Sequence, residues 1–361
     1  MKIAIIMGTR PEIIKLSELT KILGTKNCDV VFTGQHYDYN MSSQFIKEFG
    51  MRKPDYKMML TKLQNTTTDR ATQIGEIVLK LAKIITKIDP DTVIVQGDTN
   101  TVLAAAITSI KCSIPVSHVE SGLRSYDWRM PEEHNRIVTD HISELLFAPT
   151  INSQKNLKNE NVHGEIFVTG NTVIDSINMY TKISKKKSSF EFLYDEYVLM
   201  TLHRAENVDN KITLSSIIQG VLKSNANFIF PVHPRTLDRL KEFSLYEKLK
   251  KSKNILMINS VGYFEILEIM KNCSFILTDS GGIQEEATAS GIRKKVLVVR
   301  KTTDRPESVK AKLSEVIGVN HDKITKSILK ALKNPKVSSK EYPFGKGKSS
   351  EKIIKILQKK F

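Results

Sequence analysis

Residues 1–23, MKIAIIMGTRPEIIKLSELTKIL, carry the pattern that decides the fold. Ile3–Met7 is a short apolar run that predicts a buried strand, and Gly8-Thr9-Arg10 predicts a turn directly after it. Pro11 stands at the first position of a helix expected to reach about Leu23, where a missing backbone N–H costs nothing. A strand, a turn and a helix in this order are typical of the first unit of a Rossmann-like domain.

The same alternation of short strands and longer helices runs along the whole chain and predicts an α/β protein with two parallel sheets. In the first half the further expected strands are Val30–Thr33, Thr92–Gln96, Pro115–Val119 and Leu145–Ala148. In the second half they are Tyr197–Thr201, Phe228–Pro231, Ile255–Ile258, Phe275–Thr278 and Val296–Val299. We expect domains at residues 1–170 and 171–345, a linker signal at Ser184–Ser189, and an amphipathic helix in residues 346–361.

Composition narrows the class of protein. A chain of 361 residues with 40% hydrophobic content favours two folded domains, and the apolar runs are so short that we expect neither a signal peptide nor a membrane-spanning stretch. Cys28, Cys112 and Cys273 lie far apart, so we expect free thiols in a cytoplasmic protein rather than disulfides or a zinc site. The net charge of +16 comes from scattered short runs without a nucleic-acid-binding motif, which argues against a nucleic-acid partner.

Acidic residues follow the strands of the first half, at the edge of a parallel sheet where ligands bind. Asp98 comes just after Thr92–Gln96, Glu120 comes just after Val119, and Glu132 opens a later helix. One such carboxylate could be a helix cap, but three on one rim would shift one another's pKa values and cost stability. The pattern therefore favours a catalytic site.

Basic and glycine-rich turns follow the strands of the second half. His203 and His233 each lie at a strand end with an arginine close by, and no matching metal ligands surround them. For His203 an acid/base or phosphate-contact role is favoured over metal binding, because histidine titrates near neutral pH. Ser280-Gly281-Gly282 lies between a strand and a helix, which would let a diphosphate approach the helix N-terminus. Glu286, one helical turn further on, could accept hydrogen bonds from ribose hydroxyls.

These motifs, taken in order, resemble the non-hydrolysing UDP-N-acetylglucosamine 2-epimerases, specifically those of archaeal type. The matching blocks cover nearly the whole chain and include residues 8–11, 34–36, 96–99, 118–124, 131–136, 139–141, 170–172, 203–204, 233–234, 279–286 and 302–307. The resemblance implies two Rossmann-like domains that face each other across a cleft, the glycosyltransferase B type. It also implies that UDP binds mainly to the second domain and that a C-terminal helix crosses back to the first.

The resemblance further implies an elimination mechanism, in which UDP leaves carbon 1, the carbon 2 proton is removed, and UDP adds back to a 2-acetamidoglucal. No cofactor and no metal would be needed, and a homodimer acting on a UDP-sugar, with no membrane partner, would be expected. By resemblance the catalytic residues would be Asp98, Glu120, Glu132 and His203, with the individual roles of the three carboxylates left open. The substrate contacts would be Arg10, Lys15, Arg136, His233, Tyr263, Ser280, Gly281, Gly282, Glu286 and Arg305.

Some positions depart from the family pattern and leave alternatives open. Ser121 and Lys301 replace a common Ala and Asp, and Tyr37 replaces an Arg in a loop where many bacterial members bind a second, activating substrate molecule. Gln35, with His36, Gln44 and Arg70, could still form part of such a site. The same loop resembles relatives that epimerise UDP-2,3-diacetamido-glucuronate. A glycosyltransferase of the same fold and a hydrolysing epimerase are more distant alternatives, and the three carboxylates argue against simple glycosyl transfer.

Overall fold

A computed structural model describes residues 1–35, 49–61 and 68–361. The chain forms two compact units: the first contains residues 1–176 and 345–361, and the second contains residues 177–344. The expected loop residues His36 to Met41 and Gln44 lie outside the described ranges.

The first unit is built on a parallel sheet of seven strands, in the order β3-β2-β1-β4-β5-β6-β7. The central strands start level with one another: Ile3 of β1 pairs with Cys28 of β2 on one side and with Thr92 of β4 on the other. The carboxyl ends of these strands therefore meet at one edge. The strands are β1 (Ile3–Met7), β2 (Cys28–Phe32), β3 (Tyr56–Lys57), β4 (Thr92–Gln96), β5 (Val116–Val119), β6 (Leu145–Ala148) and β7 (Glu165–Val168).

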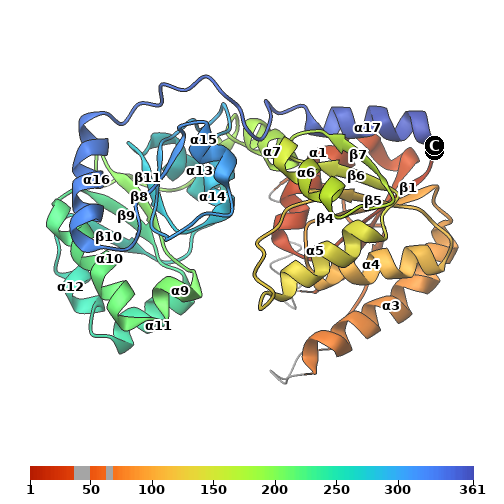
Figure 1. The fold of residues 1–361 in the computed structure, drawn as a ribbon, viewed down its shortest axis with the longest axis horizontal. Helices are drawn as coiled ribbons and strands as arrows, with labels where there is room; N and C mark the ends of the chain where they lie inside the picture. Colours follow the sequence, from red (N-terminus) through yellow and green to blue (C-terminus); the bar gives the residue numbers. More distant parts are fainter. Residues whose placement is uncertain (36–48, 62–67) are drawn as a thin grey trace. The chain divides into compact units, whose positions relative to one another are not determined.

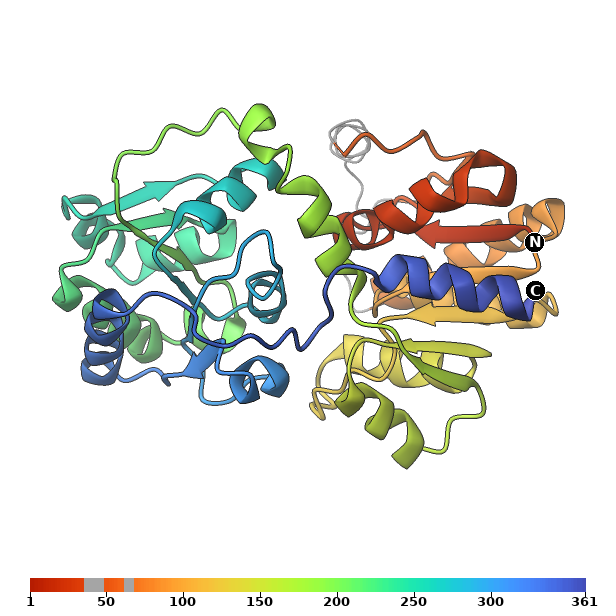
Figure 2. The same cartoon turned by 90° about the horizontal axis from the view of Figure 1, so that it is seen from above.

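Helices cover both faces of this sheet, as Figures 1 and 2 show. α1 and α17 lie side by side on one face, and α3, α4 and α5 lie on the other. The carboxylate of Asp175 accepts the backbone N–H groups of Ser349 and Ser350, at 3.1 and 2.6 Å, and so caps α17. The helices are α1 (Arg10–Asn27), α3 (Asp69–Ile88), α4 (Asn100–Lys111), α5 (Pro131–His141), α6 (Ile151–Asn159), α17 (Ser349–Lys360) and α7 (Thr172–Tyr180), which begins in this unit and ends in the second.

The second unit contains a parallel sheet of six strands, in the order β10-β9-β8-β11-β12-β13. Its core lies where α10 and α16 pack on the sheet, around Phe228, Phe230 and Leu277. The strands are β8 (Val198–Thr201), β9 (Phe228–Pro231), β10 (Ile255–Ile258), β11 (Ile276–Thr278), β12 (Val296–Val298) and β13 (Ser314–Val316). The helices are α8 (Ser184–Lys187), α9 (Ala205–Val208), α10 (Lys211–Ser224), α11 (Pro234–Glu242), α12 (Tyr246–Lys250), α13 (Tyr263–Asn272), α14 (Gly281–Glu286), α15 (Pro306–Lys310) and α16 (His321–Lys333).

The two parallel α/β sheets confirm the predicted fold class, and residues 345–361 return to the first unit. The linker signal at Ser184–Ser189 was misleading. These residues lie inside the second unit and include α8, because Ser184 is fully buried and donates its hydroxyl hydrogen to the carboxylate of Glu268 on α13.

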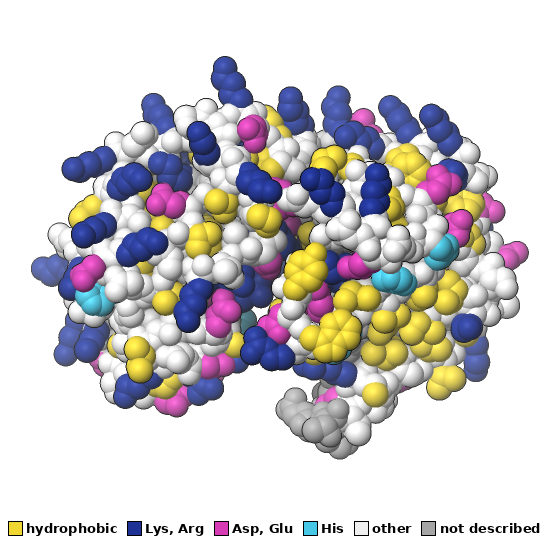
Figure 3. All heavy atoms as spheres, viewed as in Figure 1, with side chains coloured by type: hydrophobic (Ala, Val, Ile, Leu, Met, Phe, Trp, Pro, Cys, Tyr) yellow, Lys and Arg dark blue, Asp and Glu magenta, His cyan; other side chains and the backbone are white. Residues whose placement is uncertain are grey.

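Surface properties agree with several expectations from composition. Cys28, Cys112 and Cys273 are free thiols, two of them buried and one half-buried. Figure 3 shows lysine and arginine side chains scattered over the visible surface instead of gathered in one stripe. Within residues 1–35, 49–61 and 68–361, no helix has the length and apolar character that a membrane span requires.

Candidate functional site

The turn between β1 and α1 approaches the neighbouring strands so closely that only glycine fits at its first position. A Cβ on Gly8 would lie 2.2 Å from the Thr33 hydroxyl oxygen and 2.3 Å from that of Thr101. Pro11 lies in the first turn of α1, as predicted, and Glu12 in the same turn accepts hydrogen bonds from the backbone N–H groups of Gly8 and Thr9. This packing fixes where Arg10 leaves the sheet edge.

Glu120 lies at the end of β5 in a strained backbone conformation. Its φ of +70° falls in the left-handed region, which residues with a side chain seldom adopt. One carboxylate oxygen, Oε2, accepts from Lys15 Nζ on α1 at 2.5 Å and from Gln96 Nε2 at the end of β4 at 2.8 Å. Two donors from two other elements therefore aim this buried carboxylate. Strain of this kind is typical of functional sites.

Asp98 is held from α5. Arg136 contacts Asp98 Oδ2 at 2.6 Å, and the side-chain amide of Asn135 donates to the Asp98 backbone carbonyl at 2.8 Å. Arg136 also reaches Glu133 at 2.6 Å. One guanidinium thus joins the β4–α4 turn to the first turn of α5, where Glu132 lies.

The adjacent residues Glu132 and Glu133 have different environments. Glu133 is buried and accepts from the backbone N–H groups of Ser125 and Tyr126. Burial opposes ionisation of Glu133, but these hydrogen bonds and the Arg136 guanidinium outweigh it and lower the pKa. Glu132 is exposed, and it forms no ion pair or hydrogen bond within the described part of the chain. The acidic pair therefore divides into a structural carboxylate and an accessible one.

A buried network of ion pairs contacts the turns after β4 and β5. Its members were not predicted from the sequence as site residues. Asp140 on α5 contacts His118 Nδ1 and Arg124 NH1, each at 2.7 Å, and accepts the Gly122 N–H at 3.0 Å. The other ring nitrogen of His118 lies 2.9 Å from the Gly97 carbonyl oxygen, next to Asp98. Burial opposes ionisation of Asp140, yet the hydrogen bond and charge of His118, together with Arg124, lower its pKa. The only earlier signal was that these residues lie in the motif blocks.

In the second unit, a buried aspartate shapes the turn after β8. Asp279 is fully buried and accepts the backbone N–H groups of His203 and Arg204, at 3.1 and 3.0 Å, and the side-chain amide of Asn207. Burial lowers the pKa of the His203 imidazole, although the Asp279 charge opposes the shift. This shift favours the neutral imidazole, which can both donate and accept a hydrogen bond. The rings of His203 and His233 lie with centroids 6.0 Å apart.

The Ser280-Gly281-Gly282 turn has the expected position between β11 and α14. Ser280 is the N-cap of α14, and its hydroxyl oxygen accepts the Ile283 N–H at 3.4 Å, which leaves the hydroxyl hydrogen able to donate elsewhere. A Cβ on Gly281 would lie 3.0 Å from Asp304 Oδ1. Glu286 is half-buried at the end of α14.

Around Asp304 the structure gathers arginines, two of which were not expected as site residues. Arg300, Arg305 and Arg204 approach the Asp304 carboxylate at 3.0, 3.4 and 3.5 Å. Burial opposes ionisation of Asp304, but the guanidinium charges lower its pKa. Arg305 also pairs with the buried Glu285. The cluster keeps several cationic groups beside the glycine turn, which suits the binding of a phosphate.

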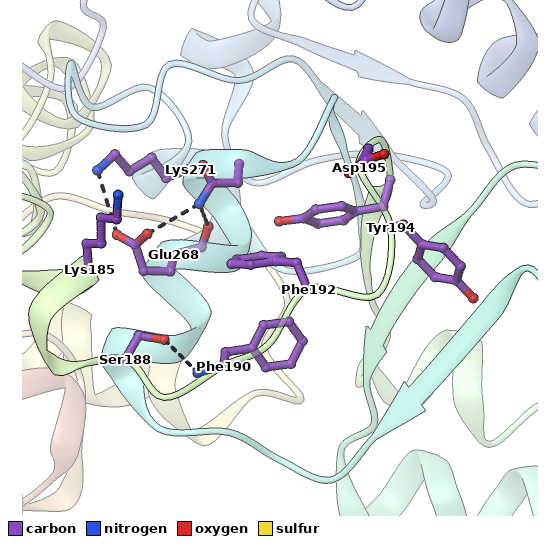
Figure 4. A pocket seen from close by; sticks show the side chains of 10 residues that line it. Lys185, Ser188, Phe190, Phe192, Tyr194, Asp195, Glu268 and Lys271 are labelled. Carbon is purple, nitrogen blue, oxygen red and sulfur yellow. Dashed lines mark hydrogen bonds and ion pairs between the residues drawn. The ribbon is translucent and has the colours of Figure 1, made fainter.

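Two other features of the second unit lie outside this arrangement. Tyr263, an expected substrate contact, is buried at the start of α13 and packs edge-on against Tyr180. A pocket of about 610 Å³ is lined by Phe190, Phe192 and Glu268, among others, and contains none of the expected site residues (Figure 4). Among the described residues, no three His, Cys, Asp or Glu side chains are grouped as a metal ion would require.

Comparisons with known proteins show what the chain is similar to. A family model described as UDP-N-acetylglucosamine 2-epimerase matches residues 23–358. The chain is 44% identical to the UDP-N-acetylglucosamine 2-epimerase of Methanocaldococcus jannaschii, over 99% of each protein. A crystal structure of the enzyme from that organism, in complex with UDP-GlcNAc and UDP, matches 99% of this chain and 100% of its own at 43% identity, with a TM-score of 0.86. The UDP-2,3-diacetamido-2,3-dideoxy-D-glucuronate 2-epimerase of Pseudomonas aeruginosa is 34% identical over 99% of this chain and 100% of its own.

Proposed function

Because this chain belongs to the UDP-N-acetylglucosamine 2-epimerase family, we propose that it interconverts UDP-N-acetylglucosamine and UDP-N-acetylmannosamine. Its two Rossmann-like domains are of the glycosyltransferase B type. The observation that supports the proposal most directly is the conformation of Glu120 at the edge of the first sheet. Its backbone is strained, and its carboxylate accepts hydrogen bonds from Lys15 and Gln96.

The reaction is an elimination followed by an addition. The hydrogen on carbon 2 is not next to a carbonyl group, so a base cannot remove it until the anomeric bond breaks. UDP leaves carbon 1 with the bonding electron pair, the carbon 2 proton passes to a base, and the C–H electrons form a double bond between carbons 1 and 2. UDP then adds back while a proton reaches the opposite face of carbon 2. No oxidant or reductant enters the balance.

The residues divide into two groups that match the two parts of this reaction. Asp98, Glu120 and Glu132, on the N-terminal domain, would exchange the proton and stabilise positive charge developing at carbon 1. His203 would act beside the departing diphosphate as a neutral imidazole, which the lowered pKa supports. We propose that the domain with the carboxylates covers residues 1–170, that the UDP-binding domain covers residues 171–345, and that residues 346–361, which contain α17, are the returning segment.

The proposed substrate contacts follow the chemistry of their side chains. Ser280, Gly281 and Gly282 would hold the diphosphate through a hydroxyl group and backbone N–H groups, and Glu286 would accept from the ribose. Lys15 and Arg136 form ion pairs with Glu120 and Asp98, so they would hold these carboxylates in place on the sugar side of the site. The remaining proposed contacts are Arg10, His233, Tyr263 and Arg305.

The test is solvent exchange at carbon 2. The protein is incubated with UDP-N-acetylglucosamine in deuterated water, and the sugar is followed by NMR. We expect deuterium at carbon 2 and accumulation of the manno epimer. The matched control is Glu120→Gln, which should still bind UDP but lose exchange. If the wild-type protein binds UDP and neither exchanges nor converts the sugar, with or without excess substrate as activator, the proposal is wrong.

The Pseudomonas aeruginosa relative supports a second candidate substrate, UDP-2,3-diacetamido-2,3-dideoxy-glucuronate. Its additional carboxylate would suit a site rich in arginine. Competition between the two sugars in the same exchange assay decides between them. A kcat/KM at least about tenfold higher for the uronate would replace the first proposal.

We also propose that the protein is a cytoplasmic homodimer. Three free thiols support that location. Figure 3 shows apolar side chains gathered over α4 and its neighbours, where Leu103, Ile107 and Ile110 share one helix face, and Lys111 is the only charged residue of α4. Two chains of charge +16 repel each other least through such a face. Ile107→Asp should therefore give monomers in light scattering, whereas the same change at the exposed Ile212 should not.

A further inference from the structure

Glu12 is a buried carboxylate that the reaction scheme above does not use. It lies in the first turn of α1, and its side chain is 1% exposed. Oxygen Oε2 accepts the N–H groups of Gly8 and Thr9, and oxygen Oε1 accepts the hydroxyl hydrogen of Thr99 at 2.6 Å. Thr99 is the N-cap of α4 and follows Asp98 directly. One side chain thus joins two turns that are 87 residues apart in the sequence.

We propose that Glu12 is a positioning residue for the epimerisation, because its ionised carboxylate holds the β1–α1 turn, which carries Arg10, at a fixed distance from the β4–α4 turn, which carries Asp98. The inference rests on the proposed function. Glu12 touches neither the reacting atoms nor UDP in this scheme. It acts through Thr99 on the Asp98 carboxylate and through Thr9 on the Arg10 guanidinium.

The hydrogen-bond pattern suits the ionised form of Glu12 best, because all three partners donate to it. The backbone N–H groups of Gly8 and Thr9 can only donate, and the Thr99 hydroxyl oxygen already accepts the Val102 N–H at 3.3 Å. A proton on Oε2 would point at two donors, and a proton on Oε1 would reverse the bond to Thr99. Protonation of Glu12 therefore loosens the connection between the two turns.

This carboxylate titrates in a range that matters for an enzyme. Burial raises the pKa of Glu12 to about 7, although its hydrogen bonds to Thr99, Gly8 and Thr9 oppose the rise. The nearby charged groups are Arg10 and Lys15 on its own helix, Asp98 on the adjoining turn, and the partners of these, which are Glu120 and Arg136. Activity should therefore fall as the pH drops through about 7, before the exposed carboxylates become protonated.

The test compares Glu12→Gln with wild type in kcat and KM between about pH 5 and pH 9. The amide has the size of the carboxyl group but brings a donor to a place where three donors already point. We expect kcat to fall about tenfold to a hundredfold, KM to change less than about threefold, and the acid limb near pH 7 to disappear. A purely structural role would reduce the amount of folded protein and leave the pH profile of the folded fraction unchanged.

Three further variants keep the proposal open to refutation. Thr99→Val removes the hydrogen bond to Glu12, together with the N-cap of α4, and should reproduce the loss of kcat, whereas Thr99→Ser keeps both and should have the kcat of wild type. Asp175→Asn removes a similar carboxylate that accepts two backbone N–H groups elsewhere in the same unit. It should lower the unfolding temperature and leave the pH profile of kcat as in wild type.

The outcomes separate this inference from the proposed function. If wild type shows no exchange at carbon 2, the proposed function itself fails. If wild type is active and folded Glu12→Gln or Thr99→Val keeps its kcat and acid limb, the inference about Glu12 is wrong. An acid limb that also moves in Asp175→Asn would assign the effect to general stability and would likewise overturn it.

Discussion

Replacing Asp140 by asparagine tests whether the buried network under the site is ionic. Asp140 is fully buried and is contacted by His118 and Arg124, each at 2.7 Å. The amide would leave the Arg124 guanidinium facing a neutral group in the interior. Removing one partner of a buried ion pair costs about 3 to 5 kcal/mol, and the lower end of that range applies here because Arg124 keeps its ion pair with Glu160 at 2.6 Å. We therefore expect a loss of that size, confined to the first unit.

Calorimetry can measure this loss, since the two units have separate cores. For a unit of this size the unfolding transition should move down by about 10 °C, while the transition of the second unit stays in place. The control is Asp127→Asn, which removes an exposed carboxylate paired with Arg129 and should leave both transitions unchanged.

The pH dependence gives an independent check on the sign. The pKa of Asp140 is lowered in the folded protein, so its stabilising effect is present above the ordinary pKa of an aspartate and is lost as the pH falls through the lowered value. The difference between Asp140→Asn and wild type should therefore shrink in acid. A shift of less than about 2 °C at neutral pH, or a difference that grows in acid, would refute an ionic network at this position.

Four other changes test separate parts of the structure. Glu120→Gln should reduce kcat far more than it weakens UDP binding, whereas Ser280→Ala should mainly weaken UDP binding, as measured by turnover kinetics and calorimetric titration. Asp175→Asn should weaken the N-terminal cap of α17 by about 1 kcal/mol and speed hydrogen exchange in that helix. Because the pKa of Glu12 is raised in the folded protein, Glu12 adds to the free energy of unfolding of wild type below pH 4.5, and this contribution is lost as the pH rises through 7. That loss amounts to about 3 kcal/mol in denaturant unfolding well above neutral pH. Glu12→Gln should lack this part of the pH dependence of the free energy of unfolding.

Buried parallel strands could be predicted from the sequence with little error. The bounds of Thr92–Gln96, Leu145–Ala148 and Ile255–Ile258 are the same in the prediction and in the structure. A strand covered on both faces needs a continuous apolar run, and such runs end where the polar turn begins. The edge strands Tyr56–Lys57 and Ser314–Val316 were missed, because they are two or three residues long and carry no such run.

The same rule placed the proposed catalytic carboxylates Asp98 and Glu120 at the ends of strands, but it did not predict the groups that contact them. Asp98 and Glu120 could be predicted because they come directly after strands of a parallel sheet. The groups that hold them, such as Gln96 and Arg136, depend on side-chain directions from elements far apart in the sequence. Glu12 illustrates the limit most clearly. In the sequence it is one more acidic residue in a first helical turn, which is the ordinary place for a cap.

The pair Glu132 and Glu133 shows what a structure adds to such a rule. Neighbours on a helix point about 100° apart, so one of two adjacent glutamates faces inward, and helical periodicity does not say which. Here Glu133 faces inward, and its carboxylate oxygens accept hydrogen bonds from Ser125, Tyr126 and Arg136. A carboxylate with these partners would have to lose several hydrogen bonds before it could accept a proton. Glu132 forms no hydrogen bond or ion pair among the described residues, so the arrangement favours Glu132 as the carboxylate that contacts the substrate.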